Sequence, residues 1–141
     1  MNKISQNVNL LFNIAKFQTE LSRRLDSRLG GLGFNEFIIL YHLSQSDDKK
    51  MRRIDLADKV GLTASGVTRL LLPMEKVGLI SKEANEHDAR VSYVVLAPGG
   101  KEKLSEGLER IELFAEELIT EDKLNKVEEL SSLIAEIGKN I

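Results

Sequence analysis

Residues 63–69, TASGVTR, combine small, hydroxyl-bearing and cationic side chains in one short stretch. Hydroxyl groups both donate and accept hydrogen bonds, and an arginine guanidinium carries five N–H donors in a fixed plane. Such side chains suit close approach to a ligand rich in acceptors, for example a phosphate group or the edge of a nucleic-acid base. The stretch therefore predicts a polar contact surface.

The residues around this stretch have the spacing of a helix-turn-helix. We expect a short helix at about 53–60 and a second helix at about 63–77 that closes at Gly78. Gly61 permits the positive φ of a tight turn, and Ala57 lets the second helix cross the first closely. The side chains expected to fill the wedge between the helices are Val60, Leu62, Val67 and Leu70.

Helical geometry sorts the second helix into two faces. Leu70, Leu71 and Met74 lie within about 60° of Val67 and are expected to face the core. The other face is slim and basic, and the free backbone N–H groups of the first turn favour phosphate. Pro73 should kink the helix or end its contact surface. The residues that we expect to contact duplex DNA here are Thr63, Ser65, Gly66, Thr68, Arg69 and Lys76.

A change of periodicity after this helix predicts a β-hairpin. Apolar β-forming residues flank the polar run 81–90, SKEANEHDAR, which we interpret as the charged loop of a two-stranded wing. Arg90 could enter the narrow minor groove, and Asp88 could hold its guanidinium. The alternative is that Asp88 and Arg90 form an ordinary solvent-exposed ion pair, which contributes under about 1 kcal/mol to stability. The position directly after a helix-turn-helix favours DNA contact.

Both ends of the chain predict helices with long apolar stripes. One helix is expected over residues 4–29, and Asn35 is expected to cap the next. A long helix starts at Pro98, and Thr120 is expected to cap a last helix whose apolar residues step by three and four. A small head domain would not bury so much apolar surface. We therefore expect a mainly α fold with a small β-hairpin wing, in which residues 1–33 and 99–141 form a helical dimerisation region and residues 34–98 form a winged helix-turn-helix lobe.

Composition and charge narrow the classes of function. The 141-residue chain has a net charge of −2, but residues 1–33 and 49–90 are each +3, whereas residues 91–141 are −5. This asymmetry indicates a side that faces a polyanion, although scattered surface charge would also explain it. The chain has no cysteine, which excludes disulfides and thiolate metal sites. Because no transmembrane run or signal peptide is apparent, we expect a cytoplasmic protein without a membrane partner.

These residues resemble the MarR family of bacterial winged-helix regulators. The resemblance rests on LTASGVTRLLLPMEKVGLI (62–80) and HDARVSYVVLAPGG (87–100), which holds the Asp-X-Arg wing signature as Asp88-Ala89-Arg90. Ala97 departs from the threonine that is usual at the end of the family's hairpin.

The resemblance implies a homodimer that binds a pseudo-palindromic operator, usually as a repressor. Ser65, Thr68 and Arg69 would then read the major groove and Arg90 the minor groove. The resemblance also implies that a small aromatic or anionic effector binds in a cleft and releases the protein from DNA. The alternative is that the residues considered for this cleft are ordinary core residues. The residues that could line such a cleft are Phe12, Phe17, Phe37, Tyr41 and His42.

Two other classes of function, an enzyme and a protein-interaction module, agree less well with the sequence. An enzyme is not expected, because His42 and His87 have no paired spacing and no metal or cofactor motif appears. A winged helix can also bind a protein partner without binding DNA. Cations on both the helix face and the wing, Arg69 and Arg90, favour DNA, since a protein-interaction surface would more typically expose aromatic residues.

Overall fold

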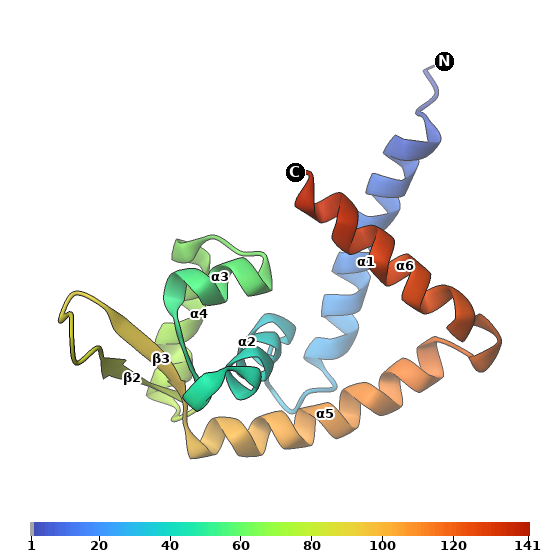
Figure 1. Ribbon diagram of the computed structural model, residues 1–141. Helices are drawn as coiled ribbons and strands as arrows, with labels where there is room; N and C mark the ends of the chain where they lie inside the picture. The colour runs from blue at the N-terminus through green and yellow to red at the C-terminus, as the bar shows by residue number, and fades with distance from the viewer. Residues whose placement is uncertain (1) are drawn as a thin grey trace.

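The computed structural model describes residues 2–141, which form six α-helices and a small antiparallel sheet (Figure 1). In chain order the elements are α1 (Gln6–Asp26), α2 (Phe34–Gln45), the 3-10 turn η1 (Asp47–Lys49), β1 (Lys50–Arg52), α3 (Arg53–Val60), α4 (Ala64–Lys76), β2 (Ile80–Ala84), β3 (Ser92–Leu96), α5 (Pro98–Leu118), the 3-10 turn η2 (Glu121–Lys123) and α6 (Leu124–Lys139). The predicted mainly α fold with a winged helix-turn-helix is confirmed.

The helix-turn-helix consists of α3 and α4 and has the predicted turn. Gly61 adopts φ +79° at the end of α3, in the left-handed region that glycine enters without steric cost. Thr63 caps α4, because its Oγ1 accepts a hydrogen bond of 3.0 Å from the backbone N–H of Gly66. Pro73 does not end the helix, which continues to Lys76.

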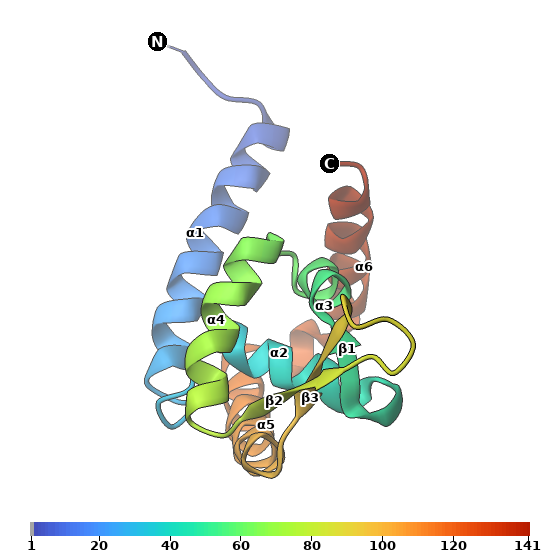
Figure 2. The same cartoon turned by 90° about the vertical axis from the view of Figure 1, so that its left-hand side faces the viewer.

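The sheet has three strands rather than the predicted two. Its order is β1-β3-β2, and both pairings are antiparallel. β1 was not predicted, because three residues, Lys-Met-Arg, are too few to show strand periodicity. β2 also continues to Ala84, so the charged loop of the wing is shorter than the predicted run 81–90. Figure 2 shows the sheet beside α3 and α4, with the wing loop projecting beyond them.

One hydrophobic core runs from the end of α1 through the helix-turn-helix to Phe114, near the end of α5. Of the predicted wedge residues, Val67 is fully buried, and Val60, Leu62 and Leu70 pack against the core, in which Leu56 is fully buried as well. Leu71 and Met74 are also buried, as the helical rotation predicted. The inward face of α4 is therefore fixed by packing, which leaves its opposite face toward solvent.

Two predicted helix caps are wrong. α2 begins after Gly33, not at Asn35, because the Glu36 carboxylate reaches back and accepts a 2.8 Å hydrogen bond from the Gly33 N–H. Thr120 precedes the 3-10 turn η2, and its hydroxyl bonds the Asp122 carboxylate instead of capping a helix.

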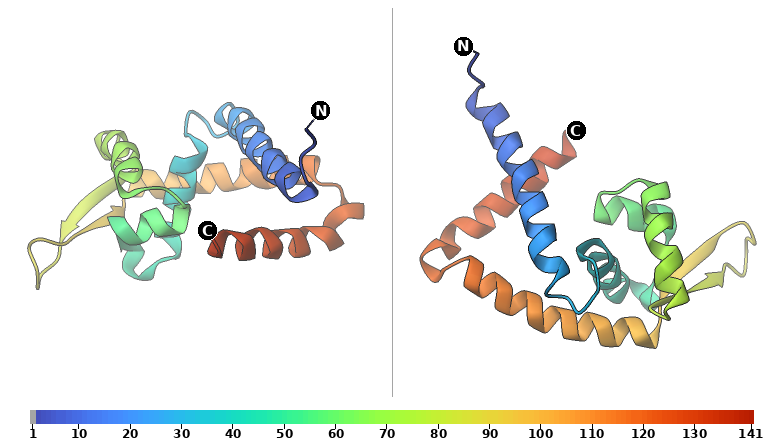
Figure 3. Two further views of the ribbon diagram at one scale, coloured as in Figure 1. Left: turned by 90° about the horizontal axis from the view of Figure 1, so that it is seen from above. Right: turned by 180° about the vertical axis from the view of Figure 1, so that it is seen from behind.

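The terminal helices leave much apolar surface exposed. α5 continues away from the wing, and α1 and α6 extend from the rest of the molecule on different sides (Figures 2 and 3). Leu25 is the one buried residue of α1, and no residue of α6 is buried. None of the helices within residues 2–141 combines the length and the apolar composition that crossing a membrane requires.

Gly100 marks the closest approach of α5 to the rest of the fold. It is buried, and a Cβ at this position would collide with the carbonyl oxygen of Leu79 and lie 2.8 Å from a methyl group of Leu96. Backbone cannot move aside as a side chain can, so the glycine allows α5 to start directly beside β2.

We predict that Gly100→Ala lowers the free energy of unfolding by about 1–3 kcal/mol, because the new methyl group overpacks this contact. Ser105→Ala is the control, since Ser105 is exposed on the same helix and its truncation adds no atom to the contact. It should leave stability unchanged or raise it by less than about 1 kcal/mol. Urea unfolding at equal chain concentration measures both. Equal stability of the two variants would contradict the packing argument.

Candidate nucleic-acid interface

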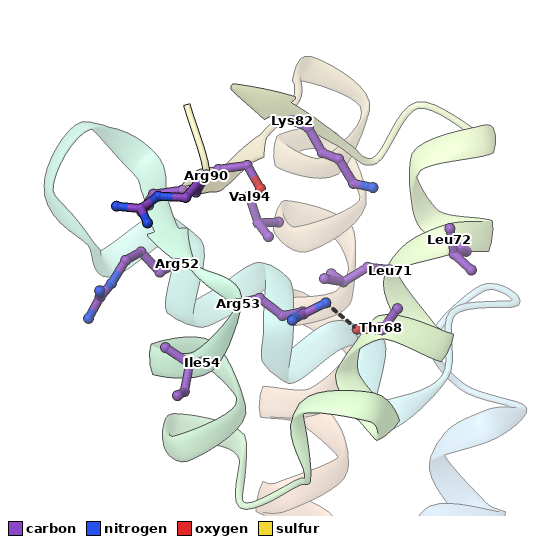
Figure 4. A pocket seen from close by; sticks show the side chains of 11 residues that line it. Arg52, Arg53, Ile54, Thr68, Leu71, Leu72, Lys82, Arg90 and Val94 are labelled. Carbon is purple, nitrogen blue, oxygen red and sulfur yellow. Dashed lines mark hydrogen bonds between the residues drawn. The ribbon is translucent and has the colours of Figure 1, made fainter. Parts of the chain in front are cut away.

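A groove of about 420 Å³ separates the outer face of α4 from the wing (Figure 4). Arg90 and Arg52 lie on one side of it, and Lys82 lies on the other, near Leu72. The exposed side chain of Leu72, on α4, also lines the groove. The lining residues are Arg52, Arg53, Ile54, Thr68, Leu71, Leu72, Lys82, Arg90, Val91, Ser92 and Val94.

A second, shallower hollow continues this surface along the first turns of α4. It is lined by Arg53, Ala64, Ser65, Thr68 and Arg69. Arg53 and Thr68 line both hollows, so the recognition-helix residues and Arg90 belong to one continuous face. The hypothesis that Arg69 and Arg90 serve one ligand requires such a shared face.

Two cations of this face are held by carboxylates. Arg52 donates to Asp55 at 3.0 and 3.5 Å, and Arg90 donates to Asp88 at 3.1 and 3.3 Å. Hydrogen bonds from Arg90 hold the pKa of Asp88 below its usual value. The Arg90 side chain is nevertheless 91% exposed. These carboxylates orient the guanidinium groups while their outer edges remain in solvent.

The wing loop is ordered by its own side chains. Asn85 Oδ1 accepts hydrogen bonds from the backbone N–H groups of His87 and Asp88, and its Nδ2 donates to the Tyr93 hydroxyl at 3.0 Å. The Asp88 carboxylate also accepts the backbone N–H of Arg90 at 3.0 Å. The loop therefore presents Arg90 from a defined turn, and the predicted pairing of Asp88 with Arg90 is present.

The hydroxyl residues of α4 have different amounts of free bonding capacity. Thr63 is occupied as the helix cap, and its hydroxyl lies 3.3 Å from that of Ser65. A Cβ on Gly66 would lie 3.1 Å from the Thr63 hydroxyl oxygen, so the glycine leaves room for the cap. Thr68 donates to the Ala64 carbonyl at 3.0 Å. Thr63 and Gly66 thus build the start of the helix, whereas Ser65 keeps the more accessible hydroxyl.

The structure gathers some of the predicted contact residues and not others. Ser65, Thr68 and Arg69 line the second hollow, and Arg90 lines the groove. Lys76 lies in the last turn of α4, about 18 Å along the helix axis from its first residue, and lines neither.

Sequence reasoning missed Arg52 and Arg53, which line the groove from the junction of β1 and α3. The available signal was two adjacent cations directly before the helix-turn-helix, but the strand that positions them was not predicted. Lys82 also belongs to β2 rather than to the wing loop.

The five residues considered for an effector cleft are spread over α1 and α2. Phe12 and Phe17 are 60% and 53% exposed, whereas Phe37 is buried in the core beside Gly107. Tyr41 and His42 are adjacent, with ring centroids 5.5 Å apart. Partial burial and then nearby Lys59 lower the pKa of His42. None of the five lines either of the two hollows described above.

Comparisons with known proteins agree with this geometry. The family model "Transcriptional regulator SarA/Rot" matches residues 27–106. An uncharacterized HTH-type transcriptional regulator, YdgJ of Bacillus subtilis, is 26% identical over 103 residues, which are 73% of this chain and 60% of that protein. The chain thus spans less than two thirds of that relative's length.

Solved structures extend the likeness to the whole chain. The transcriptional regulator BldR of Sulfolobus solfataricus is 26% identical, with a TM-score of 0.86 and complete coverage of both chains. The MarR family regulator Sco3205 of Streptomyces coelicolor, solved in complex with DNA, is 20% identical over 96% of this chain and 90% of that one, with a TM-score of 0.78. The chain belongs to the SarA/Rot family of transcriptional regulators and has the winged-helix fold of MarR family proteins.

Proposed function

We propose that this regulator binds duplex DNA sequence-specifically, as a homodimer on a pseudo-palindromic operator, and represses transcription. The observation that carries the proposal is the continuous cationic face on which the start of α4 and the wing tip converge. That face has the two elements that reading duplex DNA needs, a slim helix for the major groove and an arginine for the adjacent minor groove. A bound dimer would block access to the operator.

The chemistry of the face supports a division of labour. Ser65 and Arg69 lie on the exposed start of α4, where their donors could reach base edges in the major groove. Arg90, extended from the ordered wing loop, could enter the minor groove, where the negative potential is strongest. The two exposed arginines therefore serve different grooves in this proposal.

The dimer is inferred from the exposed apolar surface of the terminal helices. On α1, Leu11 and Phe12 are 55% and 60% exposed, and on α6, Leu130 and Ile134 are 53% and 42% exposed. Burial of apolar area stabilises association by about 25 cal/mol per Å². A second copy of the chain, placed on these faces, would cover them and set two DNA-binding lobes side by side. The predicted division into residues 1–33 with 99–141 and residues 34–98 remains part of this proposal.

Release from DNA by a small-molecule effector stays a prediction. The aromatic residues considered for it do not surround a described cavity, and Phe37 is already packed in the core.

The alternative function, a protein-interaction module, differs in its behaviour toward DNA. A gel shift with random duplex DNA at low and moderate salt separates them, because phosphate contacts release counterions and weaken steeply with salt.

We predict that Arg69→Ala and Arg90→Ala each weaken operator binding by about 1–3 kcal/mol, because each removes a guanidinium from the DNA-facing surface. The operator fragment is first selected from genomic DNA by binding, and fluorescence anisotropy then measures the affinity. Lys123→Ala is the control, since Lys123 is an exposed cation in η2, at the end of α5 that lies away from the wing (Figure 1). Unchanged affinity in both arginine variants would remove these residues from the interface.

We also predict that the chain is a dimer at micromolar concentration and that the double variant Leu130→Glu, Ile134→Glu is a monomer. The charges would lie on the apolar face of α6 and would be desolvated in a dimer. Ser132→Glu is the control, because Ser132 lies on the opposite side of the helix. Light scattering gives the mass. A wild-type monomer would contradict the proposed assembly.

A further inference from the structure

Arg53 occupies the centre of the cationic face. It is the first residue of α3, its side chain is exposed, and it lines both the groove and the second hollow. Its guanidinium points across to α4, where Nη1 donates a 3.1 Å hydrogen bond to the Thr68 hydroxyl (Figure 4). The two helices of the helix-turn-helix are thus joined at the surface that faces DNA.

The bonding capacity of these two residues differs sharply. A hydroxyl has one proton, and Thr68 uses it on the Ala64 carbonyl while it accepts from Arg53. Thr68 therefore has no donor left for a ligand. The guanidinium of Arg53 has five N–H donors, of which this bond uses one.

Arg53, like Arg69 beside it, forms no ion pair within residues 2–141, whereas the other cations of this face do. Arg52 and Arg90 each bond a carboxylate. Within residues 2–141 no carboxylate oxygen lies within 4.0 Å of the Arg53 guanidinium, as the ion pairs of the structure show. Arg53 is therefore a guanidinium with unused donors and an uncompensated charge, held in place by a neutral hydroxyl.

We propose that Arg53 binds a backbone phosphate of duplex DNA and that Thr68 is the positioning residue that orients its guanidinium, rather than a reader of bases. The planar fork matches the two oxygens of a phosphodiester. The position at the start of α3 agrees, since the first helix of a helix-turn-helix crosses the DNA backbone while the second enters the groove. This inference rests on the proposed DNA-binding function and changes the role that the sequence indicated for Thr68.

The experiment measures affinity against salt concentration for the full chain on two unrelated duplexes of about 30 base pairs, roughly three helical turns. We expect Arg53→Gln to weaken binding about tenfold on both duplexes. The slope of log affinity against log salt should fall by about 1, because one phosphate contact is lost and such contacts carry no sequence information. Lys59→Gln is the control, because it makes the same charge change on the same helix, beside His42.

Two further variants separate phosphate binding from a purely structural role. Arg53→Lys should keep the salt slope, because it keeps the charge, while binding weakens through loss of the fork. Thr68→Val should weaken binding equally on both duplexes and leave the slope unchanged, because only the orientation of Arg53 is disturbed. Circular dichroism confirms that each variant is folded, and Arg53→Ala, which also removes the charge, replaces Arg53→Gln as the decisive variant if the latter unfolds.

The outcomes distinguish this inference from the function on which it rests. If the wild type binds both duplexes and Arg53→Gln keeps the wild-type slope, the phosphate contact is wrong although DNA binding stands. A loss confined to one duplex would assign Arg53 to base reading instead and would equally overturn the proposal. A wild type that binds neither duplex at low salt would overturn the proposed function together with the inference.

Discussion

The antiparallel pairing of β1 with β3 is the constraint on which the proposed DNA-facing surface depends. It joins Lys50 to Val95 and Arg52 to Tyr93, and β1 leads directly into α3. The same strand β3 carries one side of the wing. Three residue pairs therefore fix the helix-turn-helix relative to the wing, and they set Arg53 between α4 and Arg90. Ile80, Val94 and Leu96 anchor the hairpin in the core, and the pairing with β1 adds the link between the wing and the start of α3.

Core packing on one face and the cap of its first turn together set the orientation of the exposed surface of α4. Val67, Leu71 and Met74 lock one face into the core, so the direction of the opposite face is set by packing and not by the ligand. Gly66 and Thr63 then shape the first turn, since the threonine caps the helix and the glycine leaves room for it. A surface ordered before binding loses little conformational entropy when a ligand arrives. Thr63 and Gly66 thus stabilise the start of α4, in addition to the contacts with DNA that were predicted for them.

Much of this architecture could be predicted from the sequence, because it depends on local signals. The 3.6-residue periodicity located α4 and its inward face, Gly61 located the turn, and the change to β-forming residues located the wing. The missed parts depend on contacts between distant residues. β1 is three residues long and exists only through its pairing with β3, so Arg52 and Arg53 could not be assigned to the site. The predicted caps Asn35 and Thr120 failed for other reasons, because α2 uses the Glu36 carboxylate on the Gly33 N–H and the 3-10 turn η2 separates Thr120 from α6, which has no side-chain cap.

The charge distribution explains how a chain with a net charge of −2 could still attract a polyanion. Fields beyond about 10 Å are screened at physiological salt, so only local charge counts at an interface. The groove gathers four cations, Arg52, Arg53, Lys82 and Arg90, and the excess acidic residues of the last third of the chain lie on α5, η2 and α6. Three of these cations pair with carboxylates, namely Arg52 with Asp55, Arg90 with Asp88 and, at 4.0 Å, Lys82 with Glu75. Arg53 has no carboxylate partner within residues 2–141, because its orientation comes from the neutral hydroxyl of Thr68, and so its full charge remains available where the two helices meet.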